Sequence, residues 1–163
     1  MKKRLMKEIG VTVMGIVVLS IFAQVWVSGQ VKKGDETTLI GSWDLQVTLR
    51  DCDSGFPFVT FPAMNTYDQG GTMQQTAIPE AGVTSLPGHG VWNHDTSRDY
   101  SAAFRFLSLD PNPALTRRII VRSSINLDLG GKSYTSTDAA EILTLNGDVI
   151  ARGCSTTSAI RFE

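Results

Sequence analysis

Apolar and polar residues alternate along much of this chain, which is the pattern of strands buried on one face. The alternation begins at Trp43, continues to Leu49, and is clearest in the long run from Arg117 to Leu129. Further extended runs cover residues 58–67, 72–78, 89–94, 100–106, 133–145 and 149–162. No amphipathic segment of helical period stands out in this part of the chain. The pattern therefore predicts an all-β domain of about eight strands.

Short turn signals separate most of these runs. Asn146-Gly147 is the strongest, because a type I′ hairpin turn requires positive φ angles. Pro111 and Pro113 end another strand, since proline cannot donate to a ladder. The stretch 79–90 holds two prolines and three glycines and is predicted to be a loop. Sequential strands joined in this way favour an eight-stranded antiparallel up-and-down β-barrel, because closure removes exposed edges; a two-sheet sandwich is the alternative.

The first 29 residues resemble a secretory signal rather than part of the domain. A basic start, Met1 to Lys7, precedes an apolar run from Val11 to Val27, and small residues at Ser28-Gly29 offer a cleavage site. We predict a signal helix over 1–29, a flexible leader over 30–38 and the barrel over 39–163. An uncleaved membrane anchor facing outward is the alternative, and only then would the protein have a membrane partner. The predicted location is secreted or periplasmic.

Charge argues against a nucleic-acid partner. The whole chain has 15 basic and 16 acidic residues, and losing residues 1–29 leaves 11 and 15, a formal net charge of −4. A nucleic-acid-binding domain usually carries a basic stripe. The densest basic group here, Arg117-Arg118 followed by Arg122, lies in an alternating strand and is expected to be a solvated face.

The two cysteines, Cys52 and Cys154, both follow the predicted signal. Disulfides persist in oxidising compartments, so we predict that they pair; two separate buried thiols are the alternative. If the first and last strands close the barrel, they are antiparallel, and opposed residue numbers have a constant sum. Placing Cys52 opposite Cys154 makes Trp43 and Arg161 diagonal neighbours on one face.

The triplet Gly41-Ser42-Trp43, together with Arg161 near the end of the last strand, resembles the signature of calycins, including the lipocalins. That resemblance implies a small barrel in which the tryptophan of the first strand packs against an arginine of the last. A second resemblance, carried by residues 87–92, is to barrels of the allene oxide cyclase type and to similar uncharacterised secreted bacterial proteins. It implies a cyclisation or isomerisation inside the barrel.

No residue pattern identifies catalytic, metal-binding or cofactor-binding chemistry. His89 and His94 are the only histidines, and five residues apart on a regular strand they face opposite sides, so no metal site is predicted. The serines lack a G-x-S-x-G elbow. Glu141 is expected to face solvent, with a lumen acid or base as the alternative. No cofactor is predicted, and an enzyme is the less favoured class.

The favoured function is binding of a small, largely apolar molecule inside the barrel. Pockets of this kind combine apolar walls with a few polar groups. The expected contacts are the walls Trp92, Tyr100, Phe104 and Phe106 and the polar contact His89. Small residues at alternate positions 153–159 of the last strand leave room for a lumen. The alternatives are an enzyme of cyclase or isomerase type and a structural or interaction protein whose barrel is filled.

Overall fold

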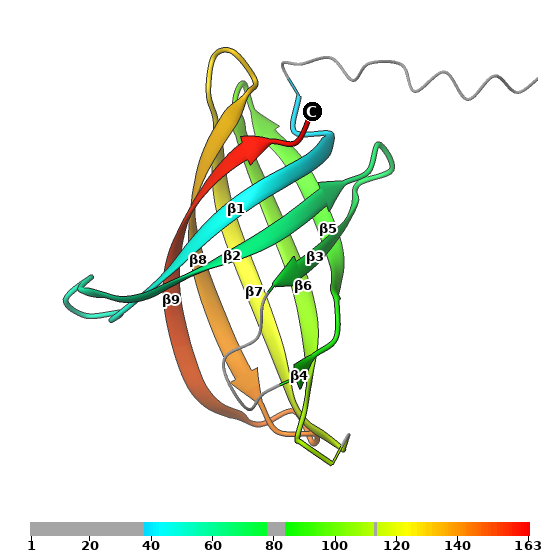
Figure 1. Ribbon diagram of the computed structural model, residues 1–163, viewed down its shortest axis with the longest axis vertical. Coiled ribbons are helices and arrows are strands. Elements are labelled where there is room, and N and C mark those ends of the chain that lie inside the picture. The colour runs from blue at the N-terminus through cyan, green and yellow to red at the C-terminus, as the bar shows by residue number, and fades with distance from the viewer. Residues whose placement is uncertain (1–37, 78–83, 113) are drawn as a thin grey trace, which may run out of the picture. The chain divides into compact units, whose positions relative to one another are not determined.

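The computed structural model describes residues 38–77, 84–112 and 114–163, and these form a closed antiparallel β-barrel of eight long strands (Figure 1). The long strands are β1 (Gly41–Arg50), β2 (Pro57–Tyr67), β3 (Thr72–Ala77), β5 (Gly88–Thr96), β6 (Asp99–Leu109), β7 (Leu115–Leu127), β8 (Ser133–Leu143) and β9 (Val149–Arg161). The two-residue strand β4 (Thr84–Ser85) pairs with the end of β6. It falls in the stretch that the sequence predicts to be a loop.

The barrel closes because every long strand pairs with its neighbours in the order β6-β5-β3-β2-β1-β9-β8-β7, and β7 pairs back onto β6. All of these pairings are antiparallel. The predicted eight-stranded up-and-down barrel is therefore confirmed, and the sandwich is not formed. The predicted signal helix and residues 30–37 of the predicted leader lie outside the described residues. No helix that could span a membrane occurs in the described part of the chain.

The two ends of the barrel differ. At the closed end, where β1 begins and β9 finishes, Trp43 and Leu39 are both 0% exposed. The indole Nε1 of Trp43 donates to the carbonyl of Leu39 at 2.9 Å, and the ring of Tyr134 packs edge-on at 4.9 Å. An apolar core at this end removes a large aromatic surface from water, which stabilises the fold by about 3 kcal/mol per buried ring of this size.

Arg161 ties the closed end together. Its guanidinium carbon lies 4.2 Å from the centre of the Trp43 ring, a cation–π contact. The same side chain donates to the carbonyls of Thr38, Ile40 and Gly131 at 2.6, 2.7 and 2.8 Å. The tryptophan–arginine contact implied by the calycin resemblance is therefore present.

Gly41 is required at this position for two reasons. Its φ of +129° lies in a region that residues with a side chain rarely adopt. A Cβ atom there would also lie 2.8 Å from the Nη1 atom of Arg161. The glycine of the triplet therefore makes room for the arginine that covers the tryptophan.

The expected register between the first and last strands is wrong by two residues. Trp43 lies directly opposite Arg161, and Cys154 lies opposite Arg50 rather than Cys52. The reason is that β1 ends at Arg50, so Cys52 lies in the following turn and reaches back to β9.

The predicted disulfide between Cys52 and Cys154 is confirmed, with the two Cα atoms 5.2 Å apart and 102 residues of separation. Closing a loop of this length stabilises a fold by about 4 kcal/mol in the chain-entropy model. The bridge is placed where the β1–β9 ladder stops. It fastens the β1–β2 turn to β9 at the start of the open end.

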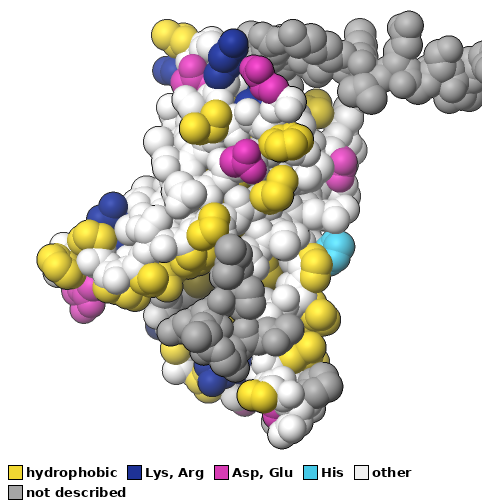
Figure 2. Space-filling view, viewed as in Figure 1, with side chains coloured by type: hydrophobic (Ala, Val, Ile, Leu, Met, Phe, Trp, Pro, Cys, Tyr) yellow, Lys and Arg dark blue, Asp and Glu magenta, His cyan; other side chains and the backbone are white. Residues whose placement is uncertain are grey.

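The β1–β2 hairpin extends past the wall of the barrel as an arm (Figure 1). Hydrophobic side chains gather on this arm in the space-filling view (Figure 2), and Phe56 and Phe58 are its most exposed aromatic residues. Among the described residues, β2 pairs with β3 up to Ala63, opposite Ala77, the last described residue of β3, whereas its pairing with β1 continues to Pro57.

Candidate functional site

The inward faces of the strands become more exposed from the closed end to the open end. Along β2 the inward residues Tyr67, Asn65, Ala63 and Val59 are 2%, 4%, 6% and 46% exposed. The inward residues of β1, β7, β8 and β9 follow the same trend. We call this accessible part of the interior the open half. Residues at inward positions that are partly exposed along its walls are Leu49, Phe61, Phe106, Ile119, Val121, Ala140, Ile142 and Gly153.

A polar cluster lies beside the closed end, where Asn65 is opposite Trp43 in the β1–β2 ladder and the ring of Tyr134 packs on Trp43. The Nδ2 atom of Asn65 donates to the hydroxyl of Tyr67 at 2.9 Å and to the hydroxyl of Tyr134 at 3.2 Å. The two hydroxyls lie 3.3 Å from each other. The Oδ1 atom of Asn65 is buried and has no hydrogen-bond partner. Because buried polar groups are almost always paired, this atom marks the cluster as unusual.

Asp138 brings a carboxylate onto the same interior surface. Its Oδ1 accepts from the hydroxyl of Ser136 at 2.8 Å, and its Oδ2 accepts from the hydroxyls of Ser155 and Thr157 at 3.2 and 2.9 Å. By alternation Arg117 faces the interior near the open end, where it pairs with Ser108, six residues along β7 from Ser123, the residue opposite Asp138. The carboxylate is therefore held by hydroxyl groups rather than by an opposite charge.

Both tyrosine hydroxyls of the cluster are strongly perturbed. Burial raises the pKa of Tyr67 from 10.0 to about 12, although hydrogen bonds from Tyr134 and Asn65 oppose the shift. Burial, followed by the nearby Tyr67, raises the pKa of Tyr134 well above its usual value. Desolvation disfavours the charged phenolate, so both groups remain protonated hydrogen-bond donors at neutral pH.

Four of the five residues expected to contact a ligand lie on inward faces and pack in two pairs. Phe104 and Phe106 pack at a ring distance of 5.4 Å, and Trp92 and Tyr100 at 5.9 Å. Phe104 and Tyr100 are buried in the core, whereas Phe106 and Trp92 are partly exposed. The indole nitrogen of Trp92 donates to the carbonyl of Asp68 at 3.0 Å. Of the four, Phe106 reaches furthest into the open half.

His89 lies apart from these four residues. It is exposed and pairs across strands with Gln74 and Arg105, which are also exposed, so it belongs to the outer face. There it lines a surface depression of about 560 Å³ with Arg105 and Arg122. Side chains alternate across a strand, and Gly88 and Gly90 take the inward positions beside His89. The histidine is therefore not grouped with the aromatic residues inside the barrel.

The two glycines beside His89 make space for the phenyl rings. A Cβ atom at Gly90 would collide with the carbonyl of Ala103 and with Phe104, because β5 and β6 run close together there. A Cβ atom at Gly88 would lie 2.8 Å from the ring of Phe106. These glycines form part of β5 and position the aromatic wall.

Sequence reasoning missed the polar cluster, although a signal was available. Asn65 stands at an inward position between Ala63 and Tyr67, and Asp138 follows Tyr134 at even spacing on β8. A polar residue at an inward position of an alternating strand is an exception to the pattern. Glu141, which the sequence brought into consideration, faces outward as expected and forms an ion pair with Arg122 at 2.9 Å.

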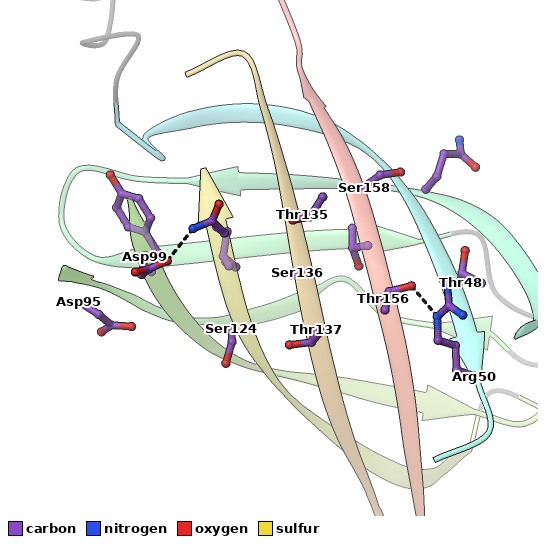
Figure 3. Close-up of a pocket in the computed structure, with 15 residues that line it drawn as sticks. Thr48, Arg50, Asp95, Asp99, Ser124, Thr135, Ser136, Thr137, Thr156 and Ser158 are labelled. Atoms are coloured by element: carbon purple, nitrogen blue, oxygen red, sulfur yellow. Dashed lines mark hydrogen bonds between the residues drawn. The ribbon is translucent and has the colours of Figure 1, made fainter. Parts of the chain in front are cut away.

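A second concave region lies on the outer face of the barrel (Figure 3). It has a volume of about 820 Å³ and is lined mainly by threonine, serine and other polar side chains of β1, β9, β8 and β7. Two pairs of its polar side chains bind each other across neighbouring strands. Arg50 donates to Thr156 at 2.8 Å, and Asn126 donates to Asp99 at 2.7 Å (Figure 3). Among the described residues, the two buried side-chain atoms without a hydrogen-bond partner, Asn65 Oδ1 and Ser108 Oγ, belong instead to inward positions of β2 and β6.

Within the described residues, no group of three or more histidine, cysteine, aspartate or glutamate side chains is arranged to hold a metal ion. His94 is bound locally, with its Nε2 2.8 Å from the carbonyl of Ser97 and its ring stacked on Tyr100.

Comparisons with protein-family models, with curated proteins and with solved structures find no match to this chain. The resemblances to calycins and to cyclase-type barrels therefore rest on Gly41, Trp43, Arg161 and the segment 87–92 of this chain alone. The interior geometry of the barrel is the basis for the function proposed below.

Proposed function

We propose that this protein is an exported β-barrel that binds a small, largely apolar molecule in the open half of its interior. The observation that carries the proposal is the exposure of inward apolar side chains there, including Phe106 and Val121, in a barrel whose other end is fully packed. Leaving these side chains accessible to water costs the fold about 25 cal/mol for each Å² of apolar surface, and a bound ligand would remove that cost.

Three further features support the proposal. The polar cluster, whose tyrosines lie close enough to the partly exposed Asp138 to feel its charge, would supply the few polar contacts that orient a ligand in an otherwise apolar site. The closed barrel and the contact between Trp43 and Arg161 fit the resemblance to lipocalins, and lipocalins bind small molecules. The disulfide between Cys52 and Cys154 fits a secreted or periplasmic location, because such bonds persist in oxidising compartments.

Binding is favoured over catalysis by the state of the interior titratable groups. A general base must lose and regain protons near the working pH. The raised pKa values of Tyr67 and Tyr134 keep both hydroxyls protonated, and the two oxygens of Asp138 already accept three hydroxyl bonds. These groups are suited to holding a ligand in place.

The test is the binding of N-phenyl-1-naphthylamine, a neutral apolar probe whose fluorescence rises in apolar surroundings. The full chain should bind it, and Ala140→Trp, which places an indole in the open half, should abolish the signal. The matched control is Ala139→Trp on the adjacent outward position of β8, which should bind the probe like the parent protein. Equal binding by the two variants would refute a site inside the barrel.

A further inference from the structure

The polar cluster has one donor hydrogen and one acceptor atom without a partner inside the cluster. Asn65 has two Nδ2 hydrogens and each tyrosine hydroxyl has one, which makes four donor hydrogens. The contacts within the cluster use three of them: two from Asn65 and one between the hydroxyls of Tyr67 and Tyr134. One hydroxyl hydrogen and the Oδ1 acceptor of Asn65 are left over. The cluster therefore lacks one partner that donates and also accepts.

The unmatched atoms belong to buried side chains that face the interior. Asn65, Tyr67 and Tyr134 are each at least nine-tenths buried and lie on inward positions of β2 and β8. An unpaired buried polar atom costs about 1 to 3 kcal/mol, so a partner there would contribute directly to affinity. Turning the Asn65 amide over would leave the nitrogen unpaired instead, and a group that both donates and accepts can bind either atom.

Asp138 restricts the charge of that partner. It lies on the same inward face of β8 as Tyr134, and its negative charge contributes to the raised pKa of both tyrosines. In a poorly solvated interior a second carboxylate near it would be repelled. A cationic amine would be attracted by Asp138, but an ammonium group has no acceptor for the leftover tyrosine hydrogen. A neutral hydroxyl meets both requirements.

We propose that the ligand class is a neutral apolar molecule with a hydroxyl head group, and that Asn65 and the hydroxyls of Tyr67 and Tyr134 bind this hydroxyl. This inference rests on the proposed function, since it assigns the head group of a ligand bound in the open half. The apolar body would lie along Phe106 and its neighbours toward the open end.

The experiment is competition against bound N-phenyl-1-naphthylamine by four probes with the same chain: 1-decanol, decyl methyl ether, decylamine and decanoate. The ether accepts a hydrogen bond but cannot donate one. We expect 1-decanol to compete about ten-fold more strongly than the ether, as one buried hydrogen bond allows, and more strongly than the amine and the carboxylate. Leucine is similar in size to asparagine, and Asn65→Leu should abolish the preference, so that the alcohol and the ether compete about equally.

Ser123→Ala is the matched control, because Ser123 is also a buried inward polar residue but lies outside the cluster, and this variant should keep the preference. Tyr67→Phe, which retains the ring, should also lower the preference and serves as the test if Asn65→Leu does not fold.

Three results would overturn the assignment of a hydroxyl head group while leaving binding in the barrel intact. These are equal competition by alcohol and ether, stronger competition by the amine or the carboxylate, and a preference that survives both cluster variants. Absence of probe binding by the parent protein would instead overturn the proposed function itself.

Discussion

The two ends of this barrel are built from the same strands but are completed in different ways. At the closed end a tryptophan, an arginine and the segment before β1 fill the interior, and Trp43 is 0% exposed. At the open end β1 and β2 leave the barrel wall as an arm. The pairing of β1 with β9 ends there, and the disulfide links the two segments instead. The contrast indicates that tight packing is concentrated at one end, whereas the other end leaves inward apolar side chains accessible.

The largest expected effect is that of removing the Trp43 side chain, which fills the closed end. Trp43→Ala should lower the free energy of unfolding by about 4 kcal/mol, because it leaves a cavity and removes the cation–π contact with Arg161. Phe61→Ala in the open half is the matched comparison and should cost about 1 to 2 kcal/mol, because that ring is only partly buried. Urea unfolding of both variants measures the difference. Equal losses would remove the distinction between the ends.

The disulfide should give the next largest effect. Replacing Cys52 and Cys154 together by serine should lower the free energy of unfolding by about 3 to 4 kcal/mol. Amide hydrogen exchange should become faster in the arm around Phe58 than at Trp43, because the bridge holds the arm at the open end. Reduction of the parent protein is the control and should reproduce the loss. If exchange became faster to the same extent at both ends, the bridge would not act mainly on the open end, contrary to this prediction.

The polar cluster should make the free energy of unfolding sensitive to alkaline pH. The pKa of Tyr67 is about 12 in the folded protein and 10.0 when unperturbed, so its stabilising effect is complete below pH 10. As the pH rises to about 12 the unfolded chain loses the proton first, and roughly 2 to 3 kcal/mol of stability should disappear. Urea unfolding across this range measures how steeply the free energy of unfolding falls with pH. Tyr67→Phe should make this fall less steep, and an unchanged fall would show that Tyr67 is not its source.

The closed end could be predicted largely from the sequence, because its features are local patterns. The alternation around Trp43 predicts the strand and its inward face, and the Gly-x-Trp triplet with Arg161 identifies the residues that fill this end. The error was in register. A strand pattern does not show where a strand stops, and β1 ends at Arg50, so Cys52 belongs to the turn.

The open half could not be predicted to the same degree, because it depends on which inward residues meet across the barrel. Asn65 and Tyr134 are 69 residues apart, and only the closed topology brings them within hydrogen-bond distance. His89 and Trp92 are both expected to contact a ligand, but they are three residues apart on β5, so that the histidine lies on the face opposite to the tryptophan. One residue of alternation separates a lumen residue from a surface residue.

The variant with the smallest expected effect on stability, Phe106→Ala, best separates folding from binding when it is compared with Phe104→Ala. Phe104 and Phe106 occupy successive inward positions of β6 and pack against each other, but Phe104 is buried and Phe106 is partly exposed toward the open half. Phe104→Ala should lower the free energy of unfolding by about 3 kcal/mol, whereas Phe106→Ala should lower it by only about 1 kcal/mol.

Binding of N-phenyl-1-naphthylamine should rank this pair of variants in the opposite order. Phe106→Ala removes a wall that faces the proposed ligand, so its affinity for the probe should fall about five-fold. Phe104→Ala, measured where the variant is still folded, should change the affinity by less, because that ring is covered by the core. If instead the affinity falls in proportion to the loss of stability in both variants, the open half and the closed end belong to one continuous core, and the contrast between them does not hold.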